Sequence, residues 1–139
     1  MIKVIAVGKI APHLKEAQEH YINRLKKLTD IEIVEVKKQK TKEDEGKLLL
    51  SKTKGFTIAL DERGKELTSK EFAKLLQKSR HISFVIGGAD GLSENVKKES
   101  DTLLSLSKLT LQHDIARIVL LEQIYRGFQI IKGTPYHRE

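Results

Sequence analysis

The sequence predicts an α/β domain with an open, parallel β-sheet and helices on both of its faces. Three observations support this prediction. Short apolar runs rich in β-branched residues recur along the 139 residues, a segment with helical periodicity follows each run, and no repeat or linker interrupts the alternation. Strands joined by helices run parallel, and helices normally cover a parallel sheet on both sides. We expect a single domain that spans residues 1–139.

The first half of the chain is predicted to contain three strands and the helices that separate them. The strands are expected where β-branched and apolar residues cluster, at Ile2–Val7, Ile31–Val36 and Phe56–Leu60. Pro12 suits the first turn of a helix, whose apolar face is formed at spacings of three and four residues by Leu14, Ala17, Tyr21, Leu25 and Leu28. Thr41 with Asp44 resembles a capping box, which predicts a second helix through Leu48, Leu49 and Leu50.

The second half continues the alternation and ends in a long helix. Thr68 and Glu71 form another capping signal, ahead of Phe72, Leu75 and Leu76. Three elements are expected next, with strands at Ile82–Ile86 and Leu103–Leu106 and a helix at about Ser93–Ser100. The final helix, Ile115–Ile131, is apolar nearly all round. Such a helix is buried on several sides, which in so small a domain indicates a subunit interface.

Composition and residue spacing exclude several classes of protein. The chain has no cysteine, so it has neither a disulfide framework nor a thiolate zinc site. Its five histidines show no helical ligand spacing and no accompanying carboxylate pair, so no metal site is expected. No apolar run approaches the roughly 20 residues that span a bilayer, and no signal peptide is expected. We therefore predict a cytoplasmic protein that does not contact membranes.

The charge of the chain favours a polyanionic partner. The formal net charge is +7 and the pI is near 9.5, and neutralising phosphates releases counterions. Lys3, Lys9, Lys26 and Lys27 are candidates for phosphate contacts; the alternative is that they form ordinary solvated surface. The charge-dense stretch Lys37–Lys47 is expected to be a solvated loop that leads into a helix.

Ligands of open α/β sheets bind beyond the carboxyl ends of the strands, here after Leu60, Ile86 and Leu106. The fourth strand runs into Gly87-Gly88-Ala89-Asp90-Gly91-Leu92, where three glycines permit close backbone approach to a ligand; the alternative is a tight strand-to-helix turn. This stretch is neither a dinucleotide fingerprint nor a P-loop. Asp61 stands where a response regulator is phosphorylated, but no acidic residues follow the first strand to hold magnesium.

Several segments together resemble one protein family. They are Phe84–Leu92, Leu104–His113, Arg117–Arg126 and Pro135–Arg138, and the opening Ile5–Lys9 also fits. On these motifs the chain resembles the ribosomal RNA large subunit methyltransferase H family of the SPOUT superfamily. Two features depart from the family pattern: Gln112 stands where the family usually has proline, and the region Lys37–Lys54 looks shortened.

The resemblance implies a SPOUT-type sheet with a C-terminal trefoil knot, assembled as a homodimer. It implies methylation of N3 of a pseudouridine in 23S ribosomal RNA of the assembled ribosome, with S-adenosylmethionine as the methyl donor. By the same resemblance, cofactor binding falls to Leu60, Gly87, Leu106, Ser107, Lys108, Leu109, Thr110 and Leu111. The alternative is a non-catalytic ribosome- or RNA-binding protein of the same fold.

The implied target nitrogen is an imide, which becomes nucleophilic only after it loses its proton. His137 or His113 can accept that proton, because imidazole titrates near neutral pH. Arg138 or Arg126 can stabilise the charge on the flanking carbonyl oxygens, and Tyr136 can stack on a base that is flipped out. We rank His137 and Arg138 first, because a mobile tail can close over the base, in a dimer also over the partner's cofactor.

Overall fold

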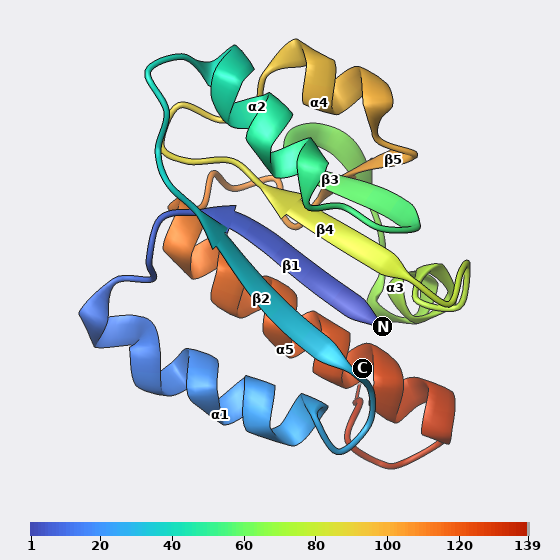
Figure 1. The fold of residues 1–139 in the computed structure, drawn as a ribbon. Helices are drawn as coiled ribbons and strands as arrows, with labels where there is room; N and C mark the ends of the chain where they lie inside the picture. Colours follow the sequence, from blue (N-terminus) through green and yellow to red (C-terminus); the bar gives the residue numbers. More distant parts are fainter. Residues whose placement is uncertain (139) are drawn as a thin grey trace.

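The computed structural model describes residues 1–138 and shows a five-stranded parallel β-sheet between two layers of helices (Figure 1). The strands are β1 (Ile2–Val7), β2 (Ile31–Val36), β3 (Phe56–Glu66), β4 (Ile82–Ile86) and β5 (Thr102–Ser105). Their spatial order is β2-β1-β4-β3-β5, and every neighbouring pair is parallel. The predicted α/β class with an open parallel sheet is confirmed.

Helices cover both faces because successive side chains of a strand point to opposite sides of the sheet. One face packs against three helices, which are α1 (Lys15–Leu25), α3 (Ser69–Leu75) and α5 (His113–Lys132). The other face packs against α2 (Lys42–Ser51) and α4 (Glu94–Glu99). Val4 and Phe84 belong to the first buried layer, and their neighbours Ile5 and Val85 belong to the second. Two cores therefore fix the sheet from both sides.

Most predicted elements lie where the sequence places them, and the differences fall at their ends. A short 3-10 helix, Pro12–Leu14, precedes α1, which stops at Leu25 before reaching Leu28. β5 begins and ends one residue earlier than expected. α5 begins at His113 rather than Ile115, because the side chain of Gln112 caps its first turn.

The largest difference is in β3, which continues past Leu60 to Glu66. Leu60 and Lys65 both pair with Leu104, so the residues between them bulge out of the ladder. Gly64 permits this close approach, because a Cβ there would lie 2.6 Å from backbone atoms of β5. The bulge places residues 61–63 at the carboxyl edge of the sheet.

The sequence predicts a threonine cap at the start of α2 and of α3, and in the structure a threonine caps each of these helices. At α3, Thr68 Oγ1 accepts from the Glu71 backbone N–H at 3.1 Å, and Glu71 Oε1 accepts from the Thr68 N–H at 2.8 Å. The Thr68 backbone N–H, followed by the Thr68 side chain, lowers the pKa of Glu71 below its ordinary value, because hydrogen bonds to the carboxylate favour its charged form. At α2, Thr41 Oγ1 accepts from the Asp44 N–H at 3.1 Å. Local cap chemistry therefore sets both helix starts.

Residues 1–138 contain neither a helix that could span a membrane nor a cluster of metal-ligating side chains. No helix in this part of the chain combines the length and the apolar character needed to cross a bilayer. The longest, α5, has 20 residues but carries Arg117, Glu122 and Arg126. The same residues hold no group of three or more His, Cys, Asp or Glu side chains suited to bind a metal ion.

Candidate cofactor site

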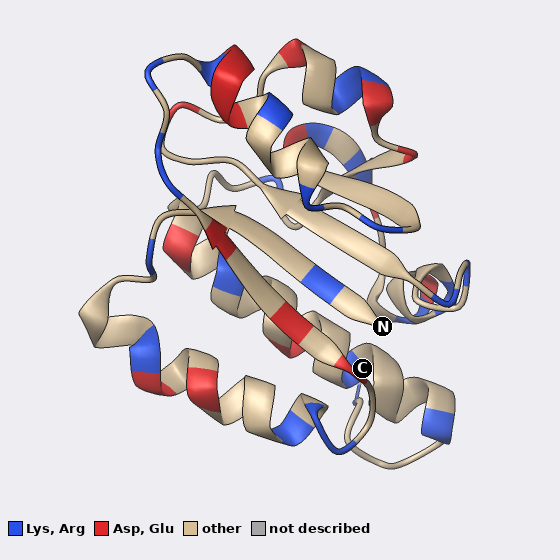
Figure 2. Cartoon of the chain, in the orientation of Figure 1, with Lys and Arg blue, Asp and Glu red and all other residues tan. Residues whose placement is uncertain are grey.

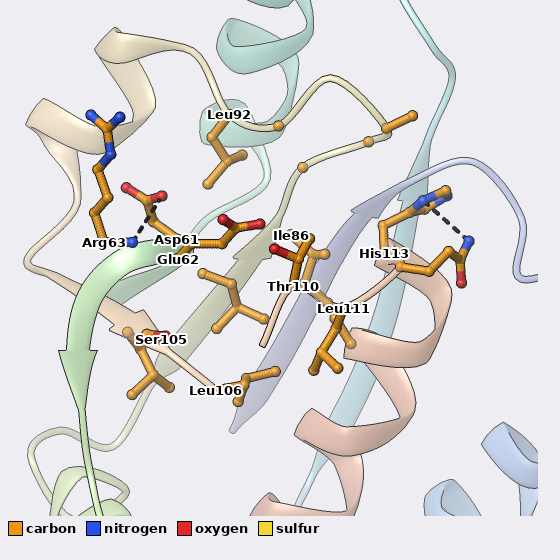
Figure 3. A pocket seen from close by; sticks show the side chains of 18 of the residues that line it. Asp61, Glu62, Arg63, Ile86, Leu92, Ser105, Leu106, Thr110, Leu111 and His113 are labelled. Carbon is orange, nitrogen blue, oxygen red and sulfur yellow. Dashed lines mark hydrogen bonds between the residues drawn. The ribbon is translucent and has the colours of Figure 1, made fainter. Parts of the chain in front are cut away.

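A cavity of about 920 Å³ opens at the carboxyl edge of the sheet (Figure 3). Its walls come mainly from three places, which are the end of β3, the turn after β4 and the segment that joins β5 to α5. These are the strand ends at which an open α/β sheet binds ligands. The volume is within the range of small-molecule and cofactor sites.

All but one of the residues predicted to bind the cofactor line this cavity: Leu60, Gly87, Leu106, Ser107, Leu109, Thr110 and Leu111. The exception is Lys108, which is exposed and not part of the lining. Of the residues predicted to be catalytic, His113 lines the cavity. Tyr136, His137 and Arg138 do not line it; Tyr136 and His137 contact Glu122 and Arg126 of α5 instead.

The turn after β4 is closed by glycine backbone. The Gly91 N–H donates to the Gly88 carbonyl at 3.0 Å, and Gly91 has a φ of +79°, which favours glycine. A Cβ on Gly87 would lie 2.6 Å from the carbonyl carbon of Gly91 and 2.8 Å from its oxygen. Gly87 is therefore needed for the turn itself to close.

Two serines shape the loop that follows β5. Ser105 Oγ donates to the Ser107 carbonyl at 2.9 Å, and Ser107 Oγ accepts from the Leu109 N–H at 2.9 Å. Local side-chain bonds of this kind replace sheet or helix bonds in turns. They bring Leu109 to the rim of the cavity with 75% of its surface exposed. An apolar side chain so exposed is available to cover a ligand.

Gln112 organises the start of α5. Its Oε1 accepts from the Ile115 N–H at 3.2 Å, and its Nε2 lies 3.3 Å from His113 Nδ1. On its other side, His113 Nε2 lies 3.5 Å from Asp114 Oδ1, close enough for electrostatic attraction. The geometry suits the tautomer whose Nδ1 accepts from the Gln112 amide. That bond occupies the lone pair that a general base would need.

A buried arginine fixes the cavity end of α5 to the sheet. Arg117 is 1% exposed, and its Nη1 donates to Glu35 Oε2 at 2.6 Å and to Gln18 Oε1 at 3.1 Å. Its Nη2 donates to the Gly8 carbonyl at 3.1 Å. One cation thus joins α5 to β2, α1 and the residue after β1. Sequence reasoning assigned Arg117 to the family pattern and gave it no structural role; an arginine amid apolar helix residues is the only local signal.

The chain turns back at Gly133, which has a φ of +76°, and the tail then packs along the middle of α5. The Tyr136 hydroxyl donates to Glu122 Oε1 at 3.2 Å. The Arg126 guanidinium lies 4.9 Å from the centroid of the Tyr136 ring, and Tyr125 meets that ring edge-on. Burial, followed by the Glu122 carboxylate, raises the pKa of Tyr136 above its ordinary value. These effects favour the protonated phenol, which donates the bond to Glu122.

The predicted catalytic residues are divided between two places in one chain. His137 Nδ1 lies 3.2 Å from Arg126 Nη1, on the same stretch of α5 that holds Tyr136. Glu122, the first anchor of the tail, is nine residues after His113 in the sequence, or about 14 Å along a helix axis. Within one chain, His113 therefore lies at the cavity, whereas the tail residues lie away from the cavity.

Charged side chains that the sequence analysis did not select form one wall of the cavity. Asp61, Glu62 and Arg63 follow Leu60, and Lys97 reaches the same wall from α4. The Lys97 Nζ lies 3.6 Å from Asp61 Oδ2. Figure 3 shows Asp61, Glu62 and Arg63 together on one side of the cavity, with Thr110, Leu111 and His113 on the other. The signal that could have found them is their position directly after a strand end.

The sheet order and a cofactor cavity bounded by three strand ends define a class of enzyme. A family model described as "Predicted SPOUT methyltransferase" matches residues 1–137, so the chain belongs to the SPOUT methyltransferases. Enzymes of this family take their methyl group from S-adenosylmethionine.

Within that class, the most informative relatives are named Ribosomal RNA large subunit methyltransferase H. The chain is 42% identical to the protein of Clostridium perfringens (strain SM101) over 157 aligned positions, which cover 99% of each chain. It is 43% identical to the protein of Caldicellulosiruptor saccharolyticus over 154 positions, covering 99% of this chain and all of that one. Both alignments exceed the 139 residues of this chain, so these relatives carry residues that it lacks.

Two solved structures are similar in fold. A probable methylase family protein from Haemophilus influenzae superposes with a TM-score of 0.64 at 12% identity, covering 99% of this chain and 70% of that one. The tRNA (m1G37) methyltransferase from Aquifex aeolicus gives 0.61 at 17% identity, covering 99% and 75%. At these identities the comparison establishes the fold only.

Proposed function

We propose that this protein transfers the methyl group of S-adenosylmethionine to N3 of a pseudouridine in 23S ribosomal RNA within the assembled ribosome. The observation that carries the proposal is the cavity at the ends of β3, β4 and β5, in a chain whose full-length relatives bear the name Ribosomal RNA large subunit methyltransferase H. The reaction is expected in the cytoplasm, where ribosomes work. The trefoil knot that the family resemblance implies stays a prediction.

The cofactor supplies an activated methyl group, and the chain supplies position and electrostatics. Ile86, Leu106 and Leu111 give the cavity an apolar side against which a flat purine can pack. The Gly87 turn and the serine-held loop after β5 present backbone groups beside it. Such groups can bond the edge of the base without an intruding side chain.

The tail supplies the groups that act on the RNA base. His137 accepts the proton of the target nitrogen, Arg138 stabilises the charge left on its carbonyl oxygens, and Tyr136 stacks on the base. Arg138 is exposed and so accessible to a substrate.

A second copy of the chain brings tail and cavity together. At the start of α5, Ile115 is 38% exposed and Ile118, on the same helix face, is half-buried, which gives this part of the helix an apolar surface to bury. Ala116, next to Ile115, lines the cavity, so a partner on this surface reaches its mouth. We therefore propose a homodimer in which the tail of one copy serves the cavity of the other.

Basic residues near the cavity provide for RNA phosphates. Figure 2 shows lysines along the loop between β2 and α2, and Lys42 at the end of this loop lines the cavity. Lys9 is exposed just after β1, at the same edge of the sheet. Lys3 is less available, because its Nζ already donates to the Lys52 carbonyl at 3.0 Å. Lys9 and Lys42 are therefore the better candidates for phosphate contacts.

The target is tested by incubating the protein with labelled S-adenosylmethionine and ribosomes that lack the modification, then mapping the labelled nucleotide by mass spectrometry. Parallel reactions use free 23S RNA, isolated large subunits and transfer RNA. We expect the label on one pseudouridine of 23S RNA, and only with ribosomes. Label on transfer RNA, or on a different base, would refute the proposed substrate.

The dimeric site is tested by mixing two inactive variants. Gly87→Val damages the cavity and keeps the tail, whereas Arg138→Ala keeps the cavity and damages the tail. If the tail acts in trans, random mixed dimers regain one intact site, or about a quarter of the wild-type sites in an equal mixture. If the tail acts in its own chain, the mixture stays inactive.

A further inference from the structure

We propose that Asp61, Glu62, Arg63 and Lys97 form the subsite for the amino-acid end of S-adenosylmethionine, so that they fix which way round the cofactor lies. This inference rests on the proposed function. The four side chains are called the charged wall below.

The charged wall exists because of the bulge in β3. Residues 61–63 leave the ladder between the two residues that pair with Leu104. Ala59 packs in the layer beneath α2 and α4, and alternation along the strand turns Asp61 to that same side. There its Oδ2 lies 3.6 Å from Lys97 Nζ of α4, with the side chains of Asp61 and Lys97 16% and 25% exposed. A negative and a positive side chain therefore lie next to each other in a partly buried wall of the cavity.

The opposite wall differs in chemistry. Ile86, Leu106 and Leu111 are apolar, and beside them the loop after β5 presents backbone held by Ser105 and Ser107. Across the cavity, Asp61 and Glu62 bring negative charge, and Arg63 and Lys97 bring positive charge. A ligand with one flat apolar end and one zwitterionic end has a single favourable orientation between such walls.

S-adenosylmethionine is such a ligand, with a flat purine at one end and a zwitterionic amino acid at the other. Its amino-acid end carries an ammonium group and a carboxylate, which the charged wall matches with two carboxylates and two cations. Charge-assisted hydrogen bonds to both groups are stronger than neutral ones. The purine end is left to the apolar wall. The competing explanation is that the Asp61–Lys97 pair merely holds α4 to β3, which would affect all nucleoside ligands alike.

Two neutral-sulfur nucleosides separate these explanations. S-adenosylhomocysteine keeps the amino-acid end, whereas 5′-methylthioadenosine lacks it and retains the purine and the ribose. By calorimetry, we expect the wild-type protein to bind S-adenosylhomocysteine at least about tenfold more tightly, the scale of one or two charge-assisted bonds. Asp61→Asn and Lys97→Met should each shrink this preference about tenfold and leave the affinity for 5′-methylthioadenosine within about twofold.

Control variants on α4 and further variants of the charged wall separate a role in ligand binding from a role in folding. Lys98→Met and Glu99→Gln change exposed neighbours on α4 outside the lining, and should leave both affinities unchanged. If Asp61→Asn or Lys97→Met loses both ligands, Glu62→Gln and Arg63→Gln decide, because their exposed side chains can be changed without disturbing the fold. Unchanged preference in these variants overturns the subsite. Failure of the wild type to bind S-adenosylmethionine would instead overturn the proposed function.

Discussion

The start and the middle of α5 are held by different kinds of contact. At its first turns, Gln112 caps the helix and the buried Arg117 ties it to β2, α1 and the residue after β1. Along its middle, the helix holds the tail by partly exposed contacts of Tyr136 with Glu122 and Arg126. The start of the helix, at the cofactor cavity, is fixed by buried charge, whereas the tail that carries the proposed reactive groups is held by contacts that water can replace. A preorganised cavity and a releasable tail suit an enzyme that must close over a large substrate.

The largest effect on cofactor affinity is expected from Gly87→Val, which alters the turn after β4 in the wall of the cavity. A Cβ at this position would collide with the Gly91 backbone, so the turn must move. A displacement of about 1 Å in a binding wall costs on the order of 100-fold, and we expect cofactor affinity to fall at least that far by calorimetry.

Gly88→Ala is the matched control for Gly87→Val. A Cβ on Gly88 would lie 3.5 Å from Glu45 and 3.6 Å from Val7, which is ordinary contact. This variant should keep its cofactor affinity within a few-fold. Equal damage from Gly87→Val and Gly88→Ala would mean that closure of the turn does not explain the need for Gly87.

The contrast between the start and the middle of α5 also explains what sequence reasoning could reach. Strand positions, the glycine turn and the threonine caps are signals within a few neighbouring residues, and apart from the ends of β3 and β5 the structure has them where the sequence places them. The role of Arg117 depends on Glu35 and Gly8, which are 82 and 109 residues away in the chain. No local pattern contains that pairing.

The charged wall was missed for a related reason. Sequence reasoning ended the third strand at Leu60, because the apolar pattern stops there. The strand instead bulges and resumes beside Leu104, since Gly64 lets the two backbones approach. The sequence does not tell which side of the sheet Asp61 faces. Only the folded arrangement shows that Asp61 lies next to Lys97 of α4.

The second prediction compares the contributions of two arginines of α5, Arg117 and Arg126, to the stability of the protein. Arg117→Met removes a fully buried cation with three hydrogen-bond partners, and we expect the free energy of unfolding to fall by about 3 kcal/mol in urea titration. Arg126→Met breaks the pair with Glu122, whose side chains are 23% and 20% exposed, and should cost about 1 kcal/mol. Equal losses would erase the proposed difference between the start and the middle of α5.

The third prediction concerns the tail alone. Arg138→Ala should lower methylation on the order of 100-fold, the scale of one lost charge-stabilising donor, and leave the cofactor affinity within about twofold. Lys132→Ala, a change at the exposed last residue of α5, should affect neither quantity. Single-turnover rates and calorimetry on the same preparations provide the comparison. A parallel fall in rate and cofactor affinity would place Arg138 in the cofactor site instead.

The smallest effect is expected at Gln112, whose side chain caps α5. Gln112→Ala removes the cap on the Ile115 N–H and should lower the free energy of unfolding by about 1 kcal/mol. Gln112→Pro should recover part of that loss, because the φ of −61° already suits proline and the unfolded chain becomes stiffer. Both variants free His113 Nδ1, so the pH dependence of the methylation rate can be compared with the wild type. If His137 is the proton acceptor, neither variant shifts that profile; a shift in both would return the role to His113.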